Sequence, residues 1–358
     1  MTDLASSWTN AGAVLTVHRW VTVIGGLLLA CMVVLMLCLQ FGATSVGVGT
    51  VATAIAHMVR GVEADSTSLE TSEIIMVQIR FPRVLMGFLV GASLAAVGVT
   101  LQALLRNPLA DPYVLGVSSG SALGVSVGIL FGIGSTLMLL PMLPLFGFAG
   151  GLLALLLIYR LAQSKGRLPI HSLLLAGVIL NAILTAFIMF ITSIMEPNRS
   201  AGLMAWLMGS LTAPNYPALG IFLLYVVFVL VILMHKAQSL NMLTLGEETA
   251  RSLGVETEGI KKRLFALTAL LTGAIVSVSG MIGFVGMVVP HAVRLVIGSD
   301  HRLLLPASAL VGGMFLAVAD TIARTIMAPA EIPVGIVTAL TGGPFFLYLL
   351  LWRKDRMV

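Results

Sequence analysis

A few charged side chains lie inside the apolar stretches of this sequence, and these are the residues that could do chemistry within a membrane. Asp320 and Arg324 stand four residues apart in one such stretch. A charge inside a membrane span is by default a candidate for a role in translocation. Opposite charges at this spacing, however, lie on one helix face and pair with each other. The spacing favours a structural ion pair, with a translocation role as the alternative.

The other chemistry-bearing residue types do not form a recognisable site. No histidine spacing is typical of a metal site, so we expect no bound metal; the positions concerned are His57, His171, His235, His291 and His301. The chain contains no G-x-x-x-x-G-K-[ST] loop that could hold ATP, and no catalytic triad is visible. The sequence therefore predicts neither an enzyme nor a chain that binds its own cofactor.

The composition is that of a polytopic membrane protein. Of the 358 residues, 58% are hydrophobic and 10% are charged, whereas a soluble domain carries about 25% charged residues. The mean hydropathy is +1.07. The net charge of +5 requires no nucleic-acid partner, because membrane proteins keep Lys and Arg in their cytoplasmic loops.

Ten apolar stretches approach the roughly 20 residues that a helix needs to cross the hydrocarbon. The predicted spans are 20–41, 83–105, 114–133, 142–160, 171–194, 215–235, 263–281, 285–298, 303–327 and 333–352. With both termini in the cytoplasm, fifteen of the 20 Lys and Arg residues fall on the cytoplasmic side, as the positive-inside rule requires. We therefore predict one transmembrane domain, 1–358, with cytoplasmic segments 1–19 and 236–262 and a periplasmic segment 42–77.

Two parts of the chain resemble each other. "LVGASLAAVG" at 89–98 matches "LTGAIVSVSG" at 271–280, and at the same offset Pro108 matches Pro290 and Gly116 matches Gly298. Spans 2–5 thus correspond to spans 7–10. Since five crossings separate the copies, their orientations are opposite, which is typical of transporters. Chance similarity between helices rich in Gly, Ala and Val is the alternative.

The segment 236–262 contains signals for a short helix. Thr244 and Glu247 fit a capping box, and Gly254 fits the stop position, so we predict a helix at about 245–253. It is too polar to enter the membrane. Docking of a cytoplasmic partner and simple packing on the bundle are the two explanations for it.

Several segments together resemble the FecCD-type permeases, the membrane subunits of ABC importers for ferric siderophores, haem and vitamin B12. The resemblance runs from about Gln78 to the C-terminus and is carried by "QIRFPRVLMGFLVGASLAAVGVTLQALLRNPLADPYVLGVSSGSALG", "LNMLTLGEETARSLGV", "GMIGFVGMVVPHAVRLVIGSDHR" and "EIPVGIVTALTGGPFFLYLLL". It implies an all-α permease of a type II ABC importer. Its partners would be a second permease copy, two ATPase subunits that carry ATP and Mg, and a periplasmic binding protein.

The resemblance also suggests roles for individual residues. The helix at 245–253 resembles the family's coupling helix, which makes Gly246, Glu247, Ala250, Arg251 and Gly254 the candidate contacts with the ATPase. The turn that begins at Arg106, with its prolines 108 and 112, is expected to pack beside this helix on the cytoplasmic side.

The family's translocation path implies a second set of residues. Span 5 is expected to line this path together with span 10, and the segment after span 5 to gate its outer side; the candidates are Asn181, Thr185, Ser193 and Arg199. Arg80 and Arg83 break the positive-inside pattern. We expect them to meet carboxylates of the binding protein, or to form salt bridges with Glu70 or Glu73.

The expected function is import of an iron complex, a ferric siderophore or haem, across the bacterial inner membrane. Vitamin B12 is the alternative substrate. A secondary transporter driven by an ion gradient should carry carboxylates along its path, and Asp320 is the single candidate. A respiratory scaffold should show paired histidines within its spans, and the sequence has none.

Overall fold

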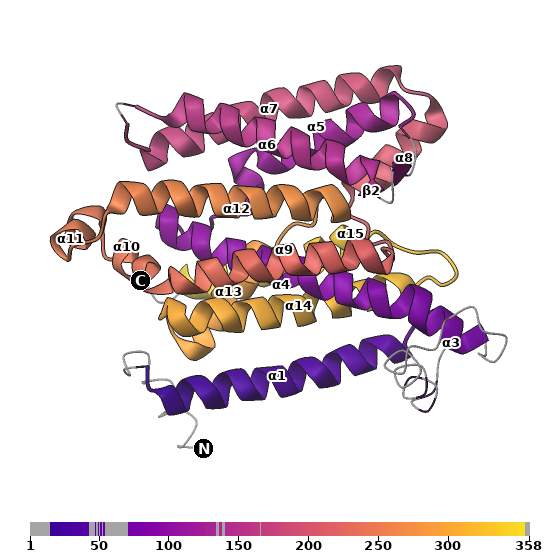
Figure 1. Cartoon of the computed structure of the whole chain (residues 1–358), viewed down its shortest axis with the longest axis horizontal. Helices are drawn as coiled ribbons and strands as arrows, with labels where there is room; N and C mark the ends of the chain where they lie inside the picture. The colour runs from indigo at the N-terminus through magenta and orange to yellow at the C-terminus, as the bar shows by residue number, and fades with distance from the viewer. Residues whose placement is uncertain are drawn as a thin grey trace.

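The computed structural model describes residues 15–42, 47, 49, 51, 53, 71–133, 136–137, 140–164 and 166–354. Most of the predicted segments 1–19 and 42–77 therefore lie outside the described residues. The long helices run along one common axis (Figure 1). The first half of the chain contains α1 (Val17–Gln40), α3 (Thr71–Ile75), a π-helical turn (Met76–Arg80), α4 (Phe81–Leu105), a 3₁₀ turn (Pro112–Leu115), α5 (Val117–Leu130), α6 (Met142–Ala162) and α7 (Ile170–Ile194). A two-stranded antiparallel hairpin, β1 (Thr136–Leu137) and β2 (Leu140–Pro141), joins α5 to α6.

The second half continues the helical bundle. It contains α8 (Pro197–Leu207), α9 (Tyr216–His235), α10 (Ala237–Thr244), α11 (Glu247–Ser252), α12 (Thr257–Ser279), α13 (Val285–Ile297), α14 (His301–Thr325) and α15 (Val334–Lys354). Seven of the described helices are long and apolar enough to cross a membrane: α1, the continuous helix Ser72–Leu105, α6, α7, α9, α12 and α14. The remaining predicted spans fall on the shorter apolar helices α5 and α13 and on the apolar stretch Val334–Tyr348 of α15. Each predicted span thus coincides with a helix, and helix length supports a full crossing for seven of them.

One boundary error concerns α12, which begins at Thr257 whereas the predicted span begins at 263. The segment 236–262 is therefore mostly helical, because it holds α10, α11 and the first turns of α12. The prediction placed Lys261 and Lys262 in this cytoplasmic segment, outside the seventh span. Lys261 is instead buried within the helix, where its charge is paired with nearby carboxylates.

The segment from Arg106 to Gly116 is more than the surface turn predicted between spans 2 and 3. Arg106 ends α4 with a left-handed backbone, φ 49°, and Asp111 accepts a hydrogen bond from the backbone of Tyr113 at 2.8 Å. The chain then enters the bundle. A Cβ on Gly116 would lie 3.0 Å from the carbonyl oxygen of Gly177 on α7. Because this segment occupies part of the depth of the bundle, the following helix α5 is short.

The helix contacts follow the order that an inverted repeat requires. α4 packs against α13 and α14, and α12 packs against α5 and α6. With α4 equivalent to α12, α5 to α13 and α6 to α14, each of these contacts has its counterpart in the other half. α4 and α12 also run in opposite directions, since α4 ends and α12 begins near α11 (Figure 1).

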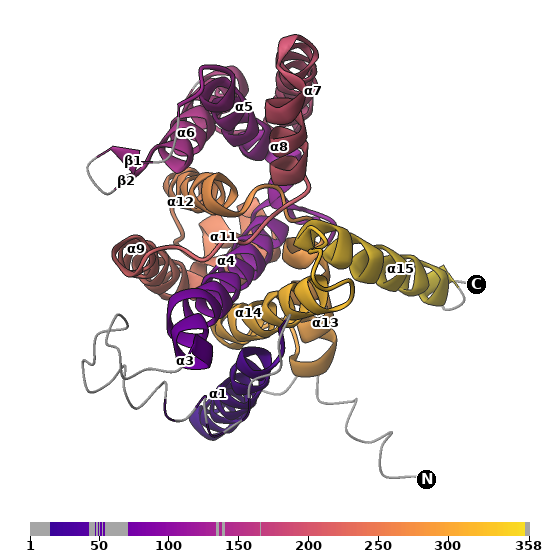
Figure 2. The same ribbon diagram turned by 90° about the vertical axis from the view of Figure 1, so that its right-hand side faces the viewer.

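The helix α4 lies at the centre of the bundle (Figure 2), and almost all of its residues are buried. Its glycines face other backbones. A Cβ on Gly91 would overlap the carbonyl oxygen of Gly312 on α14, and one on Gly98 would overlap that of Gly286 on α13. Small residues permit such close approach in lipid, where the hydrophobic effect does not drive helix association.

The first helix, α1, lies at the margin of the bundle (Figure 2) and is fastened at both ends by arginine side chains. Arg19 donates a hydrogen bond to the carbonyl of Ile297 at 2.9 Å, which places the start of α1 near α13. At the other end, Arg324 donates to the carbonyl of Cys38 at 2.8 Å. Arginine can satisfy the last carbonyls of a helix in this way, because they have no partner within the helix.

The substitution Gly91→Ala should lower the stability of the folded protein. Its methyl group would meet the backbone of Gly312, which cannot give way without separating α4 from α14, and overpacking of this kind costs about 1–3 kcal/mol. Thermal unfolding in detergent measures the loss. Gly220→Ala on α9 is the matched control, because nothing lies within 4 Å of the added methyl; equal melting temperatures for the two variants would contradict the packing argument.

Candidate functional site

The short helices α10 and α11 lie at one end of the bundle, where α12 begins (Figure 1). We call this the α11 end, and the end that carries α8 the α8 end. Two glycines set the limits of α11. Gly246 precedes it with φ 116° and ψ 151°, a region that is accessible essentially to glycine alone. Gly254 follows it with φ 83°.

The predicted stop at Gly254 is confirmed. The backbone N–H of Val255 donates to the carbonyl of Ala250 at 3.0 Å, and that of Gly254 donates to Arg251 at 2.9 Å. These two bonds form a Schellman motif, which needs a left-handed residue at the position of Gly254. The sequence therefore fixes where the chain leaves α11.

The predicted capping box is wrong. Thr244 is the last residue of α10, and its hydroxyl donates to the carbonyl of Asn241 at 2.7 Å. Gly246 takes the capping position and has no side chain to cap the helix. The carboxylate of Glu247 turns toward α12 and α4 instead, because cationic side chains from both helices lie within reach there.

A buried lysine, Lys261, bonds to three acceptors around α11. The side chain of Lys261 is 4% exposed, and its Nζ lies 3.1 Å from Glu247 on α11 and 2.7 Å from Glu258 in the first turn of α12. A third hydrogen bond goes to the carbonyl of Leu168 at 3.4 Å. An ammonium group has three donors, and all three have an acceptor here. A buried charge is tolerated when it is paired and hydrogen-bonded in this way.

Two arginines complete what we call the Lys261 cluster, which consists of Lys261, Glu247, Glu258, Arg106 and Arg251. Arg106 at the end of α4 lies 3.7 Å from Glu247. Arg251 on α11 lies 3.5 Å from Glu258 and donates from Nε to the hydroxyl of Thr257 at 2.9 Å. The predicted packing of the Arg106 turn beside α11 is confirmed by the Arg106–Glu247 contact.

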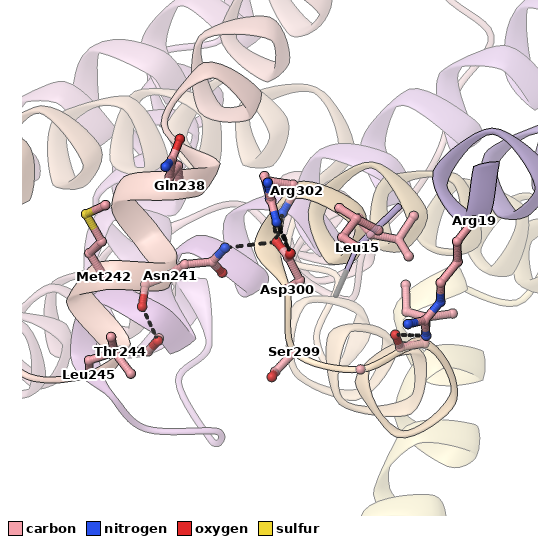
Figure 3. A pocket seen from close by; sticks show the side chains of 13 residues that line it. Leu15, Arg19, Gln238, Asn241, Met242, Thr244, Leu245, Ser299, Asp300 and Arg302 are labelled. Atoms are coloured by element: carbon pink, nitrogen blue, oxygen red, sulfur yellow. Dashed lines mark hydrogen bonds and ion pairs between the residues drawn. The ribbon is translucent and has the colours of Figure 1, made fainter. Parts of the chain in front are cut away.

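Two hollows flank the junction of α10 and α11. One, of about 680 Å³, is lined by the Lys261 cluster together with Arg167, Pro169, Ile170, His171, Leu245, Gly246, Glu248 and Thr249. The other, of about 460 Å³, is lined by Leu15, Arg19, Gln238, Asn241, Met242, Thr244, Leu245, Ile297, Gly298, Ser299, Asp300, Arg302 and Leu303 (Figure 3). Leu245 borders both and is 64% exposed, so it projects between two concave surfaces.

A carboxylate at the turn between α13 and α14 lines the second hollow and bonds to two other residues that line it. Asp300 accepts hydrogen bonds from Arg302 at 2.6 Å and from Asn241 on α10 at 2.8 Å (Figure 3). The bonds from Arg302, with that from Asn241, lower the pKa of the Asp300 carboxyl to about 2. The carboxylate is therefore charged at physiological pH and ties α10 to the start of α14.

The predicted contact residues of α11 differ in their accessibility. Ala250 is fully buried, so its inclusion among the residues available to a partner is wrong. Arg251 has a 46% exposed side chain, while the carboxylate of Glu247 is directed to the Lys261 cluster. The surface that remains accessible includes Leu245, Glu248, Thr249, Arg251, Ser252, Leu253 and Gly254.

The residues predicted to line a path lie on different faces of α7. Asn181 is half-buried and accepts a hydrogen bond from Ser119 on α5, so its side chain is directed into the bundle. Thr185 is also half-buried, whereas Ser193 is exposed. The exposed face of α7 is apolar and carries Leu175, Ile179, Ile183, Phe187, Phe190 and Ile194. Asn181 lies two positions from both Ile179 and Ile183. Because a helix turns about 100° per residue, its side chain points away from this exposed stripe.

At the α8 end, the predicted pair of Asp320 and Arg324 is present but is part of a larger group. The two side chains approach to 3.6 Å. The closest cationic group to Asp320 is Arg83 on α4, which donates from NH2 at 2.9 Å and from Nε at 3.1 Å. The remaining NH1 of Arg83 lies 2.9 Å from Glu331 in the connection between α14 and α15. We call these four residues the Arg83 cluster.

The placement of Arg80 and Arg83 argues against the first predicted alternative, contact with a binding protein; Glu70, a partner named in the second alternative, lies outside the described residues. Arg80 is 3% exposed and donates hydrogen bonds to the carbonyls of Leu39 and Gln40 at the end of α1. The Arg83 side chain is 12% exposed and is saturated by two carboxylates. Buried carbonyl and carboxylate acceptors hold both guanidinium groups inside the bundle, so we do not propose a contact between them and another protein.

Arg199 on α8 remains accessible, with 44% of its side chain exposed. It lies 3.4 Å from Glu196 and donates to the carbonyl of Leu130 at the end of α5 at 3.1 Å. Arg199 therefore connects the short helix α8 to the end of α5. Among the described residues, no three His, Cys, Asp or Glu side chains gather as ligands of a metal would.

Residues 15–352 match the FecCD transport family. The chain belongs to this family. Within the FecCD family, it is 44% identical over 295 residues to the cobalamin import permease BtuC of Halobacterium salinarum, with 80% of this chain and 76% of the relative aligned. It is 42% identical to the hemin transport permease HmuU of Yersinia pestis, covering 79% of this chain and 84% of that one.

The fold agrees with a solved structure of the same type. An inward-facing metal-chelate type ABC transporter superposes with a TM-score of 0.77 at 30% identity, covering 93% of this chain and 99% of the other. The protein is thus a multi-pass membrane protein with the almost entirely helical architecture of FecCD permeases.

Lys261 and Glu258 were not predicted from the sequence, although they hold the centre of the Lys261 cluster. A lysine and a glutamate three residues apart are a common surface pair. Their position at a predicted membrane boundary, beside a second lysine, gave no sign of burial. The acceptor at Leu168 lies 93 residues away in the sequence, so local spacing cannot reveal it.

The substitution Asp320→Asn should destabilise the protein strongly, because it leaves Arg83 and Arg324 without their buried counter-charge. Removing one partner of a buried ion pair costs about 3–5 kcal/mol. The Asp320 side chain is 2% exposed and that of Glu331 is 53% exposed. Glu331→Gln is the control and should cost less than about 1 kcal/mol. Thermal unfolding of the two variants measures the difference, and an equal shift in melting temperature would refute the assignment of Asp320 as the central anion.

Proposed function

We propose that this chain is the membrane-spanning subunit of an ATP-driven importer that moves an iron complex, a ferric siderophore or haem, into the cytoplasm. The observation that carries the proposal is the construction of α11. Its outer surface is accessible, while its inner surface is bonded to α4 and α12 through the Lys261 cluster. A force applied to the exposed surface is therefore passed directly to long helices of the bundle.

The proposed assembly contains a second permease copy, two ABC ATPase subunits that bind ATP and Mg, and an extracytoplasmic binding protein. α11 supplies a compact platform for the ATPase, with the apolar side chains of Leu245 and Leu253 64% and 57% exposed. The two hollows beside Leu245 can accept side chains of that partner. With α11 facing the cytoplasm, the start of α1 and the end of α15 also face the cytoplasm of a bacterial plasma membrane.

The second copy would cover the apolar faces of α7 and α15. Both helices lie at the margin of the bundle, and α15 projects from it (Figure 2). Exposed residues of α15 include Leu340, Leu347 and Leu351. Larger exposed apolar surfaces mark contacts with lipid or with another chain. A path between two such copies would pass the accessible Ser193 and Arg199, near the α8 end.

The charge distribution favours ATP-driven transport over transport driven by an ion gradient. A gradient-driven carrier needs an intramembrane carboxylate that changes its charge during the cycle. Asp320 is the carboxylate in question, and it is enclosed by Arg83 and Arg324. It is bonded to guanidinium groups from α4 and from its own helix, so it is suited to hold helices together.

The names of the relatives support metal complexes as the class of substrate, but they differ in which complex is transported. HmuU is named for hemin transport and BtuC for cobalamin import, while a relative from Bacillus subtilis, 36% identical, is named for iron(3+)-hydroxamate import. Hemin, cobalamin and iron(3+)-hydroxamate are all large metal complexes. The sparsely charged outer faces of α7 and α15 are suited to such compounds. We propose the iron complexes as substrates, with vitamin B12 as the alternative.

The proposal is tested in proteoliposomes that contain the permease with its ATPase, with the binding protein outside. We expect uptake of a ferric siderophore or haem that requires ATP and persists when ion gradients are collapsed. Cobalamin is measured in parallel, and preferential uptake of cobalamin would replace the proposed substrate. Uptake that follows an ion gradient without ATP would overturn the proposed function.

A charge reversal on α11 tests the docking surface. Glu248 is exposed on α11, so Glu248→Lys should weaken binding of the ATPase by about tenfold, a typical cost of a like-charge or unpaired contact at an interface. Copurification and titration of the ATPase measure the effect. Glu196→Lys is the matched control, because it makes the same change on an exposed residue at the α8 end. If both variants bind the ATPase equally well, α11 is not the dock.

A further inference from the structure

The Lys261 cluster reaches a third element besides α11 and α12. Leu168 lies in the connection between α6 and α7, and its backbone is bonded on both sides. Its N–H donates to Glu258 Oε2 at 3.0 Å, and its carbonyl accepts from Lys261 Nζ at 3.4 Å. The Leu168 side chain is buried. The connection is therefore held by the same ion pair that holds α11.

The bonded residue stands immediately before α7. Pro169 is the N-cap of that helix, and Ile170 is its first residue. Proline has a fixed φ and no N–H, so little conformational freedom separates Leu168 from α7. A displacement of the Lys261–Glu258 pair would accordingly move the beginning of α7, whose opposite end carries the accessible Ser193.

Other polar links between α11 and the bundle are weaker. Among the described residues, these links run through Arg106 and Arg251, whose side chains are 42% and 46% exposed. Exposed ion pairs contribute little, because water screens them. Lys261 is 4% exposed, so its attraction to Glu247 is screened least. The strongest polar link from α11 to the long helices therefore passes through this one ammonium group.

We propose that Lys261 is a positioning residue that transmits movement of α11 to the start of α7, and so couples ATP hydrolysis on the partner subunit to reorientation of the path. This inference rests on the proposed function. Lys261 need not touch substrate or ATPase, because it acts through Glu247 on one side and through Leu168 on the other. A purely static role would stabilise the bundle without changing how much substrate moves per ATP hydrolysed.

The test compares Lys261→Met with Lys262→Met in proteoliposomes with the ATPase and the binding protein. Lys262 is the adjacent residue and donates to the carbonyl of Gly166 in the same connection at 2.6 Å, but among the described residues it makes no hydrogen bond or ion pair with α11. We expect Lys261→Met to hydrolyse ATP while its uptake per ATP falls by about tenfold, the usual scale of coupling between linked sites. Lys262→Met should retain the wild-type ratio, and Lys261→Arg should restore part of it.

The outcomes separate the two proposals. If the wild-type assembly shows no ATP-dependent uptake, the proposed function fails. If the wild type is coupled and Lys261→Met keeps the wild-type uptake per ATP, the role of Lys261 is refuted. Should Lys261→Met fail to fold in thermal unfolding, Glu247→Gln replaces it, since that variant keeps the Lys261–Glu258 pair and weakens the link to α11. An unchanged uptake per ATP in Glu247→Gln would likewise refute the proposal.

Discussion

The close approach of α4 to the helices around it is the constraint on which the rest of the structure depends. In lipid, helices associate through packing and hydrogen bonds, so two backbones must come nearly into contact. Gly91 and Gly98 permit this contact with α14 and α13. Because α4 is thereby fixed, its two ends bring Arg83 and Arg106 to the ion clusters at opposite ends of the bundle.

The two clusters share one physical design. Each contains a nearly buried ion, Asp320 or Lys261, that is saturated by partners from different elements, and each has a more exposed partner at its edge. A buried charge that loses its partner is costly, so the elements joined by each cluster cannot separate freely. The clusters therefore join helices that apolar packing alone would leave able to slide, and the Lys261 cluster does so beside the surface offered to a partner.

Local signals predicted some elements closely and others poorly. The span predicted at 171–194 corresponds to α7, which begins at Ile170, and the proline-containing span at 285–298 corresponds to α13, which ends at Ile297. The glycine stop at Gly254 was also predicted, because a Schellman turn is decided by adjacent residues. The predicted capping box was wrong because the Glu247 carboxylate pairs with Arg106 and Lys261, which come from two other helices. These charged contacts are more favourable than a hydrogen bond from one backbone N–H.

The sequence by itself determined the membrane class, the helices, the repeat and the resemblance to FecCD permeases, because hydropathy, periodicity and motif order are properties of neighbouring residues. Only the tertiary structure decided which charges are buried and with which partners. Arg83 meets a carboxylate 237 residues away, and Lys261 meets a carbonyl 93 residues away. Electrostatic pairing depends on distance in space and on the exclusion of water, and neither quantity is written in the spacing of residues along the chain.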